Sequence, residues 1–160
     1  MALKPLIIEL GAQLTAREWK LATAESCTGG GVAYYLTKIA GSSGWFERGF
    51  VSYSNLAKVE MLGVKQATLD NYGAVSEQTV RAMADGVLSH SQAQVSIAIT
   101  GIAGPDGGSK DKPVGTVWFG WAGIAIETQT TAQLFTGNRN EIRIQSIQFA
   151  LETLLTILKP

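Results

Sequence analysis

One serine in this sequence is flanked in a way that suits nucleophilic chemistry. Ser26 follows an apolar run that ends at Ala24, and it precedes three glycines at 29–31. This pattern predicts a strand that ends just before Ser26 and a helix that begins just after it, so unpaired backbone N–H groups would lie near the hydroxyl. Such donors can stabilise an oxyanion, and the glycines leave room for a substrate. The competing interpretation is structural, with Ser26 or Thr28 serving only as a helix N-cap.

A nucleophilic serine needs a base, and the sequence contains only one histidine, His90, in a polar stretch that we do not expect to be catalytic. A lysine can serve instead if burial or a nearby positive charge lowers its pKa. With Asn55 as N-cap, Lys58 would lie in the first turn of a helix, where the macrodipole disfavours a cation. The alternative is an ordinary exposed lysine. Tyr53, at the end of the preceding strand, could hydrogen-bond either partner or pack in the core.

Two arginines near the C-terminus offer a site for an anion. Arg139 and Arg143 are four residues apart, and the same step of four reaches Ile147 on the core-facing side of a predicted helix. Two guanidinium groups at a helix start suit a phosphate. Alternatively, Glu141 could pair with either arginine in a structural salt bridge. The glycine-rich loop 101–108 could add phosphate or ribose contacts, although it matches neither the Walker nor the Rossmann pattern.

Composition excludes several classes of protein. The 160 residues suit one domain, 1–160, and thirteen basic residues balance thirteen acidic ones, which argues against a nucleic-acid partner. One cysteine and one histidine are too few for a Cys/His zinc site, and we expect no metal or cofactor.

With no signal peptide and no apolar run of about 18 residues, we expect a cytoplasmic protein without a membrane partner. Trp45 would suit a homo-oligomer interface or ordinary core packing.

The elements that must position these residues alternate along the chain. The patterns predict helices at 5–14, 32–40, 56–62, 77–88 and 138–158, and strands at 19–24, 48–54, 95–100, 114–121 and 127–135. Early alternation followed by adjacent strands predicts an α/β domain, with a mixed sheet covered by helices in three layers and a hairpin from the last two strands. Because ligands bind beyond the carboxyl ends of strands, the site should form from loops 26–31, 54–58 and 100–108.

Several segments occur in an order that is typical of one family. They are residues 24–30 (AESCTGG), 53–58 (YSNLAK), 73–77 (GAVSE), 100–108 (TGIAGPDGG) and 112–117 (KPVGTV), followed by a basic Gly-x-Arg at 137–139. Together they closely resemble the CinA C-terminal domain family over roughly residues 6–158. One departure is Asn138, where the family often has aspartate. Asparagine can still cap a helix, so the change mainly removes a carboxylate near the predicted phosphate site.

The resemblance implies an activity and a set of site residues. The family hydrolyses the carboxamide of nicotinamide mononucleotide to nicotinate mononucleotide and ammonia, in pyridine-nucleotide recycling, by a serine–lysine mechanism without metal. It implies Ser26 as nucleophile and Lys58 as base, and we count Tyr53 as a third catalytic residue. The expected substrate-binding residues are Cys27, Thr28, Gly29, Gly30, Asn55, Thr100, Gly101, Gly104, Arg139 and Arg143.

A second function stays open at this point. The family includes paralogues thought to lack activity, so the alternative is a non-catalytic nucleotide-binding or regulatory module, linked to competence or DNA-damage responses, that uses the same pocket. Longer members add an N-terminal domain associated with ADP-ribose pyrophosphatase activity. The 160 residues leave no room for that domain, so we expect that activity to be absent.

Overall fold

The computed structural model describes residues 3–160, and their order of elements is close to the predicted one. The elements are α1 (Leu3–Ala16), β1 (Leu21–Glu25), α2 (Gly31–Thr37), a 3-10 turn (Ser42–Gly44), β2 (Phe46–Val51), α3 (Asn55–Leu62), α4 (Gln66–Tyr72), α5 (Glu77–Ser89), β3 (Val95–Gly101), β4 (Thr116–Gly123), β5 (Ile126–Leu134) and α6 (Arg139–Leu158). The strands form one sheet in the order β2-β1-β3-β4-β5. β1 pairs parallel with β2 and β3, whereas β3, β4 and β5 pair antiparallel. The predicted mixed sheet and hairpin are confirmed.

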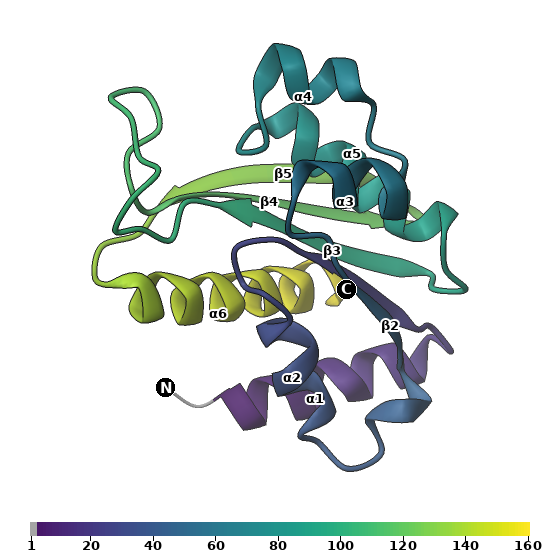
Figure 1. The fold of residues 1–160 in the computed structure, drawn as a ribbon. Coiled ribbons are helices and arrows are strands. Elements are labelled where there is room, and N and C mark those ends of the chain that lie inside the picture. The colour runs from purple at the N-terminus through teal and green to yellow at the C-terminus, as the bar shows by residue number, and fades with distance from the viewer. Residues whose placement is uncertain (1–2) are drawn as a thin grey trace.

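Helices cover both faces of the sheet, which confirms the predicted three layers (Figure 1). α1, α2 and α6 pack on one face around a core that includes Leu10, Phe119 and Leu151. α3, α4 and α5 pack on the other face around a smaller core that includes Met83 and Val87. β1 is buried along its whole length because it lies between two strands and two helical layers. Within residues 3–160, no helix has the length and apolar character needed to cross a membrane.

The structure contains one helix that the sequence analysis missed. α4 is seven residues long and buries only Leu69. A helix this short with a single buried side chain has no apolar repeat, so periodicity gives no signal for it. α4 joins α3 to α5 and so belongs to the layer that carries Lys58.

The start of α3 also differs from the prediction. The Ser54 hydroxyl accepts a hydrogen bond from the Ala57 amide at 3.0 Å, which makes Ser54 the N-cap and Asn55 the first helical residue. Lys58 is therefore the fourth helical residue instead of the third. The predicted strand over 48–54 ends earlier, at Val51, because residues 52–54 already turn the chain toward α3.

Trp45 packs in the core and does not present an interface. Its side chain is buried, and a Cβ placed on Gly11 would lie 2.7 Å from the indole Nε1. The indole ring of Trp45 therefore packs against α1 at Gly11, where there is no side chain to obstruct it. An interface role for Trp45 is wrong, and the homo-oligomer itself stays a prediction.

Gly86 fixes how closely α5 approaches α3, and we expect its replacement to destabilise the fold. A Cβ at Gly86 would lie 2.2 Å from the carbonyl oxygen of Leu62. Alanine gains up to about 1 kcal/mol over glycine inside a helix, but overpacking costs about 1–3 kcal/mol, and here the clash is with backbone. Gly86→Ala should lower the free energy of unfolding by about 1 kcal/mol or more.

A matched control is available elsewhere in the chain. A Cβ on Gly44 would meet no atom within 4 Å, so Gly44→Ala should change the free energy of unfolding by less than about 0.5 kcal/mol. Denaturant unfolding measures both variants. Equal stability of the two variants would contradict the close packing of α5 on α3.

Candidate active site

Ser26 and Lys58 meet at the carboxyl end of β1, although 32 residues separate them in sequence. The Lys58 Nζ lies 2.9 Å from the Ser26 Oγ. Ser26 directly follows β1, and its amide donates to the Ile99 carbonyl of β3, which fixes the serine to the sheet edge. Lys58 comes from α3 and is 1% exposed. The structure thus brings together the two residues that the sequence analysis named as nucleophile and base.

Two backbone carbonyls complete the surroundings of the Lys58 amino group. The Nζ donates to the Ser52 carbonyl at 3.0 Å and to the Tyr53 carbonyl at 2.9 Å. Carbonyl oxygens only accept hydrogen bonds, and a neutral amine has two hydrogens and one lone pair. When Lys58 is neutral, the two carbonyls take its hydrogens, so the lone pair is left for the Ser26 hydroxyl. Burial lowers the pKa of Lys58 to about 8, which makes the neutral form accessible.

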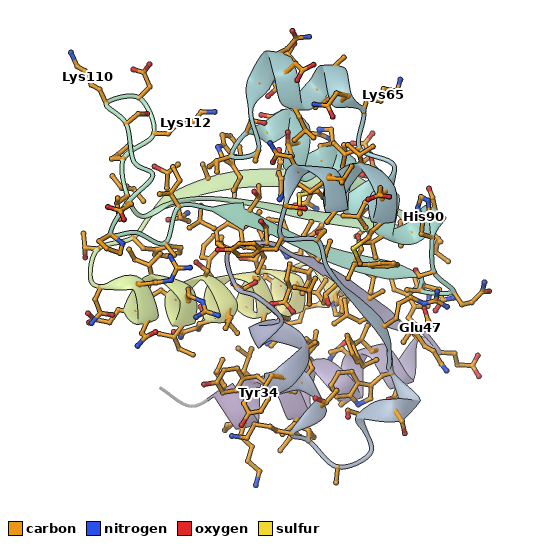
Figure 2. All side chains as sticks on the ribbon, viewed as in Figure 1. Tyr34, Glu47, Lys65, His90, Lys110 and Lys112 are labelled. Carbon is orange, nitrogen blue, oxygen red and sulfur yellow. The ribbon has the colours of Figure 1, made fainter. Side chains whose placement is uncertain are left out.

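The other lysines and the histidine lie outside this environment. Lys65, Lys110 and Lys112 extend from the surface of the molecule (Figure 2). Lys112 reaches only the carbonyl of Tyr72, at 2.9 Å. His90 ends α5, and its ring contacts the Gly86 carbonyl. The expectation that His90 does not serve as the base agrees with this position.

The Ser26 hydroxyl is free of any structural capping duty. Gly30 occupies the N-cap position of α2 with φ 98° and no side-chain hydrogen bond. The first turn is held instead by Glu25, whose carboxylate accepts from the amides of Val32 at 2.8 Å and Ala33 at 3.0 Å. The capping interpretation of Ser26 and Thr28 is therefore wrong. Sequence reasoning missed Glu25 because it lies six residues before α2, outside the spacing of known capping motifs.

The free backbone donors lie in the loop after β1 and not in the helix. Glu25 occupies amides at the start of α2, whereas within residues 3–160 the amides of Cys27 and Thr28 have no protein acceptor. The Cys27 thiol is 6% exposed, and burial raises its pKa to about 12. It therefore stays protonated and is a poor nucleophile. Of the two side chains, Ser26 is the one that contacts the Lys58 amino group.

A cavity of about 290 Å³ opens at the dyad. It is bordered by Ser26, Cys27, Tyr53, Asn55, Lys58, Ala74, Val75, Thr100, Gly101, Ile102, Ala103, Gly104, Asp106, Gly107 and Arg139. Its volume is near the lower end of the range of small-molecule sites, about 300–1,000 Å³. The predicted binding residues Cys27, Asn55, Thr100, Gly101, Gly104 and Arg139 thus border one cavity, whereas Thr28, Gly29, Gly30 and Arg143 do not. Asp106 and the segment 74–75 were not predicted as site residues.

The two arginines do not share one binding site. Arg139 borders the dyad cavity and donates to the Gly104 carbonyl at 2.7 Å. Arg143 lies behind the loop, where its Nη2 donates to the Thr28 carbonyl at 3.1 Å, and it borders a neighbouring cavity of about 400 Å³. Four residues advance a helix by about 6 Å, and the two guanidinium groups border different cavities. The structure therefore does not bring both arginines to the dyad cavity, as the prediction of a joint phosphate site expected.

The N-terminus of α6 keeps its cap despite the Asn138 departure. The Asn138 side chain accepts from the Glu141 amide at 2.9 Å, and the Glu141 carboxylate accepts from the Asn138 amide at 3.0 Å. This reciprocal pair is a capping box. The prediction that asparagine still caps is confirmed, and Glu141 serves the cap instead of pairing with an arginine.

Tyr53 contacts the dyad through its backbone and not through its ring. Its carbonyl accepts from Lys58 at 2.9 Å and also from the Ser26 hydroxyl at 3.2 Å while Lys58 is an ammonium that donates to the Ser26 Oγ. Its side chain is 58% exposed, with the hydroxyl 3.4 Å from the Arg139 Nη2. Both predicted positions for the ring, at the dyad and in the core, are therefore wrong. The Ser52 and Tyr53 carbonyls were missed because a backbone acceptor leaves no signal in the residue type.

Comparison with known proteins identifies the family. The family profile described as the CinA C-terminal domain matches residues 3–158. A protein named nicotinamide-nucleotide amidohydrolase PncC from Enterobacter agglomerans is 56% identical over 153 residues, which cover 96% of this chain and 93% of that protein. The protein of the same name from Escherichia coli strain K12 is 53% identical over 146 residues, 91% of this chain and 88% of that protein.

Solved structures agree with the sequence matches. The competence/damage inducible protein CihA from Agrobacterium tumefaciens superposes with a TM-score of 0.94 at 43% identity, over 97% of this chain and 94% of that one. The CinA superfamily protein KP700603 from Klebsiella pneumoniae 700603 also reaches 0.94, at 38% identity over 99% and 98% of the two chains. With the profile match over nearly all of its length, the chain belongs to the CinA C-terminal domain family.

Proposed function

We propose that this chain hydrolyses the carboxamide of nicotinamide mononucleotide to nicotinate mononucleotide and ammonia, with Ser26 as nucleophile and Lys58 as base. The names of its relatives support an amidohydrolase that acts on nicotinamide nucleotides. The observation that carries the mechanism is the 2.9 Å contact between the Lys58 Nζ and the Ser26 Oγ in a buried setting.

In the first half-reaction the Ser26 Oγ attacks the carboxamide carbon while the neutral Lys58 amine takes the hydroxyl proton. The resulting oxyanion accepts a hydrogen bond from the free amide of Cys27, a residue that borders the cavity. Lys58, now an ammonium, returns the proton to the amide nitrogen. The C–N bond then breaks, ammonia leaves, and the acyl group stays on Ser26 as an ester.

In the second half-reaction water replaces ammonia. Lys58 is neutral again and takes a proton from a water molecule whose oxygen attacks the ester carbon. When the ester bond breaks, the proton goes to the Ser26 Oγ, and the nicotinate carboxylate is released. The carbonyls of Ser52 and Tyr53 hold the amino group in place through both steps.

Arg139 supplies the phosphate contact in this proposal. Among the described residues, two cationic side chains border the cavity, and Arg139 is the one that is not the proposed base. Its hydrogen bond to the Gly104 carbonyl fixes the guanidinium at the cavity edge, and its remaining N–H groups can donate to phosphate oxygens. Arg143 has a different role, in which its bond to the Thr28 carbonyl supports the loop that carries the oxyanion donor, the Cys27 amide.

The buried lysine favours an enzyme over a binding module. Burying an amino group with no carboxylate partner costs free energy, and none of the three ion pairs within residues 3–160 includes Lys58. A protein that only bound nucleotides would gain nothing from this arrangement, whereas a general base requires it.

Variants of the dyad test the two roles directly. Ser26→Ala and Lys58→Ala should each lower kcat for ammonia release by at least about 100-fold, and the double variant should be little worse because nucleophile and base act as a unit. Lys58→Arg should fail too, since a guanidinium cannot take the serine proton. Lys110→Ala, at an exposed lysine, is the control and should keep full activity. Substantial turnover by Ser26→Ala would exclude the serine mechanism.

The rate should rise with pH, because only the neutral form of Lys58 can accept the serine proton. Burial lowers the pKa of Lys58 to about 8, so kcat/KM should increase about tenfold per pH unit well below that value and level off above it. Initial rates of ammonia release between pH 6.5 and 9.5 measure the profile. A flat profile over this range would argue against a lysine base.

Phosphate recognition should depend on Arg139 alone. Charge-assisted hydrogen bonds contribute about 1.5–3 kcal/mol each, so Arg139→Ala should raise KM for the mononucleotide roughly 10- to 150-fold. The same variant should leave KM for nicotinamide riboside, which lacks the phosphate, nearly unchanged. Arg143→Ala should instead lower kcat for both substrates. A KM increase for the mononucleotide in Arg143→Ala but not in Arg139→Ala would reverse the assignment.

A further inference from the structure

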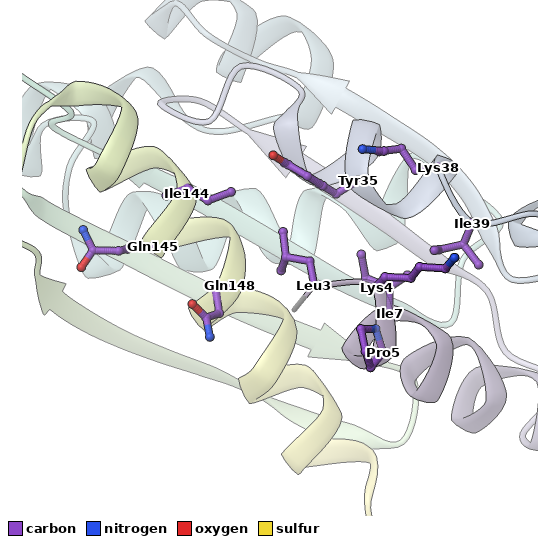
Figure 3. A pocket seen from close by; sticks show the side chains of 10 residues that line it. All are labelled: Leu3, Lys4, Pro5, Ile7, Tyr35, Lys38, Ile39, Ile144, Gln145 and Gln148. Atoms are coloured by element: carbon purple, nitrogen blue, oxygen red, sulfur yellow. The ribbon is translucent and has the colours of Figure 1, made fainter. Parts of the chain in front are cut away.

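A third cavity lies between α1, α2 and α6, away from the dyad (Figure 3). Its volume is about 770 Å³, within the range of ligand sites. We call it the N-terminal groove, and define it by an apolar floor and a basic rim: Leu3, Ile7, Ile39 and Ile144 form the floor, and Lys4 and Lys38 the rim. It shares no lining residue with the dyad cavity, so ligands of the two can be told apart.

The charges of the groove all have one sign. Among residues 3–160, Lys4 and Lys38 line it and no carboxylate does. The ion pairs found in residues 3–160 are Arg48–Glu47, Arg81–Glu77 and Lys159–Glu9, so neither rim lysine has an acidic partner there. The Lys38 Nζ lies 5.5 Å from the ring centroid of Tyr35, which also lines the groove.

The start of helix α1 also favours negative charge in the groove. α1 begins at Leu3 beside the groove, and its first turn contains no acidic residue. The positive end of the helix dipole therefore adds to the field of the two lysines. The apolar floor, in contrast, gains from contact with hydrocarbon or aromatic surface. One occupant satisfies both requirements only if it joins an anionic group to an apolar body.

We propose that the N-terminal groove is a binding site for a small amphipathic anion, a molecule with one carboxylate, sulfonate or phosphate group on an aliphatic or aromatic body. The anionic group lies between Lys4 and Lys38, and the body covers Ile7, Ile39 and Ile144. The groove reaches toward the catalytic loop, because Tyr35 and Ile144 also line the cavity that contains Arg143. This site is independent of the amidase reaction, and its test needs no turnover.

The test uses 8-anilinonaphthalene-1-sulfonate, an anionic apolar fluorophore, with the full chain. Its fluorescence should rise saturably, and decanoate should displace it at lower concentration than the uncharged n-decanol. Reversing both rim charges in Lys4→Glu/Lys38→Glu should raise Kd about tenfold. Lys110→Glu makes a similar change at a distant exposed lysine and should leave Kd unchanged. Arg139→Ala, which removes a cation from the dyad cavity, should also leave it unchanged.

Several results would overturn the proposal. They are the absence of saturable binding, an unchanged Kd in Lys4→Glu/Lys38→Glu, an equal weakening by Lys110→Glu, and a loss of binding in Arg139→Ala. Thermal melting checks that each variant is folded. If Lys4→Glu/Lys38→Glu unfolds, the milder Lys4→Gln/Lys38→Gln variant takes its place. Light scattering tests the alternative that a second copy of the chain fills the groove. A dimer that does not bind the fluorophore would support that alternative and overturn the proposal.

Discussion

The buried amino group of Lys58 is the constraint on which the site depends. An ammonium removed from water and left without a carboxylate is unfavourable, so the surrounding backbone must offer acceptors. It does so because β2 ends at Val51 and the chain turns into α3, which frees the carbonyls of Ser52 and Tyr53 from the sheet. The amide of Ser52 remains tied to the Glu25 carbonyl, so the turn is held against β1. The edge of the sheet, the turn at residues 52–54 and the start of α3 are thus held together around the Lys58 Nζ.

The two helical layers position different parts of the site at the carboxyl end of β1. The layer of α3, α4 and α5 supplies Lys58, and the distance between α3 and α5 depends on the close approach of Gly86 to the Leu62 carbonyl. The layer of α1, α2 and α6 shapes the nucleophile loop, through Glu25 at the start of α2 and Arg143 against the Thr28 carbonyl. The Ser26 loop and Lys58 are therefore supported from opposite faces of the sheet, and the two side chains meet where its parallel strands end.

Residue types predicted the dyad and the sheet, but not the contacts that the backbone makes. Ser26 and Lys58 stood out because few other side chains offered a nucleophile and a base, and strand alternation was enough to predict the mixed sheet. A carbonyl is common to every residue, so the acceptors at Ser52 and Tyr53 left no signal. Helical spacing placed Arg139 and Arg143 on one face of α6, but it could not show that the Gly104 carbonyl holds the first and the Thr28 carbonyl the second. α4 escaped because one buried leucine makes no pattern.

The single cysteine next to the nucleophile has a consequence for redox chemistry. The Cys27 thiol is buried, and its pKa of about 12 lies far above that of Lys58, so it stays protonated while the base titrates. Peroxide and disulfides react with the thiolate, which this thiol does not form at neutral pH. The loop therefore places a sulfur atom beside Ser26 without adding a reactive thiolate.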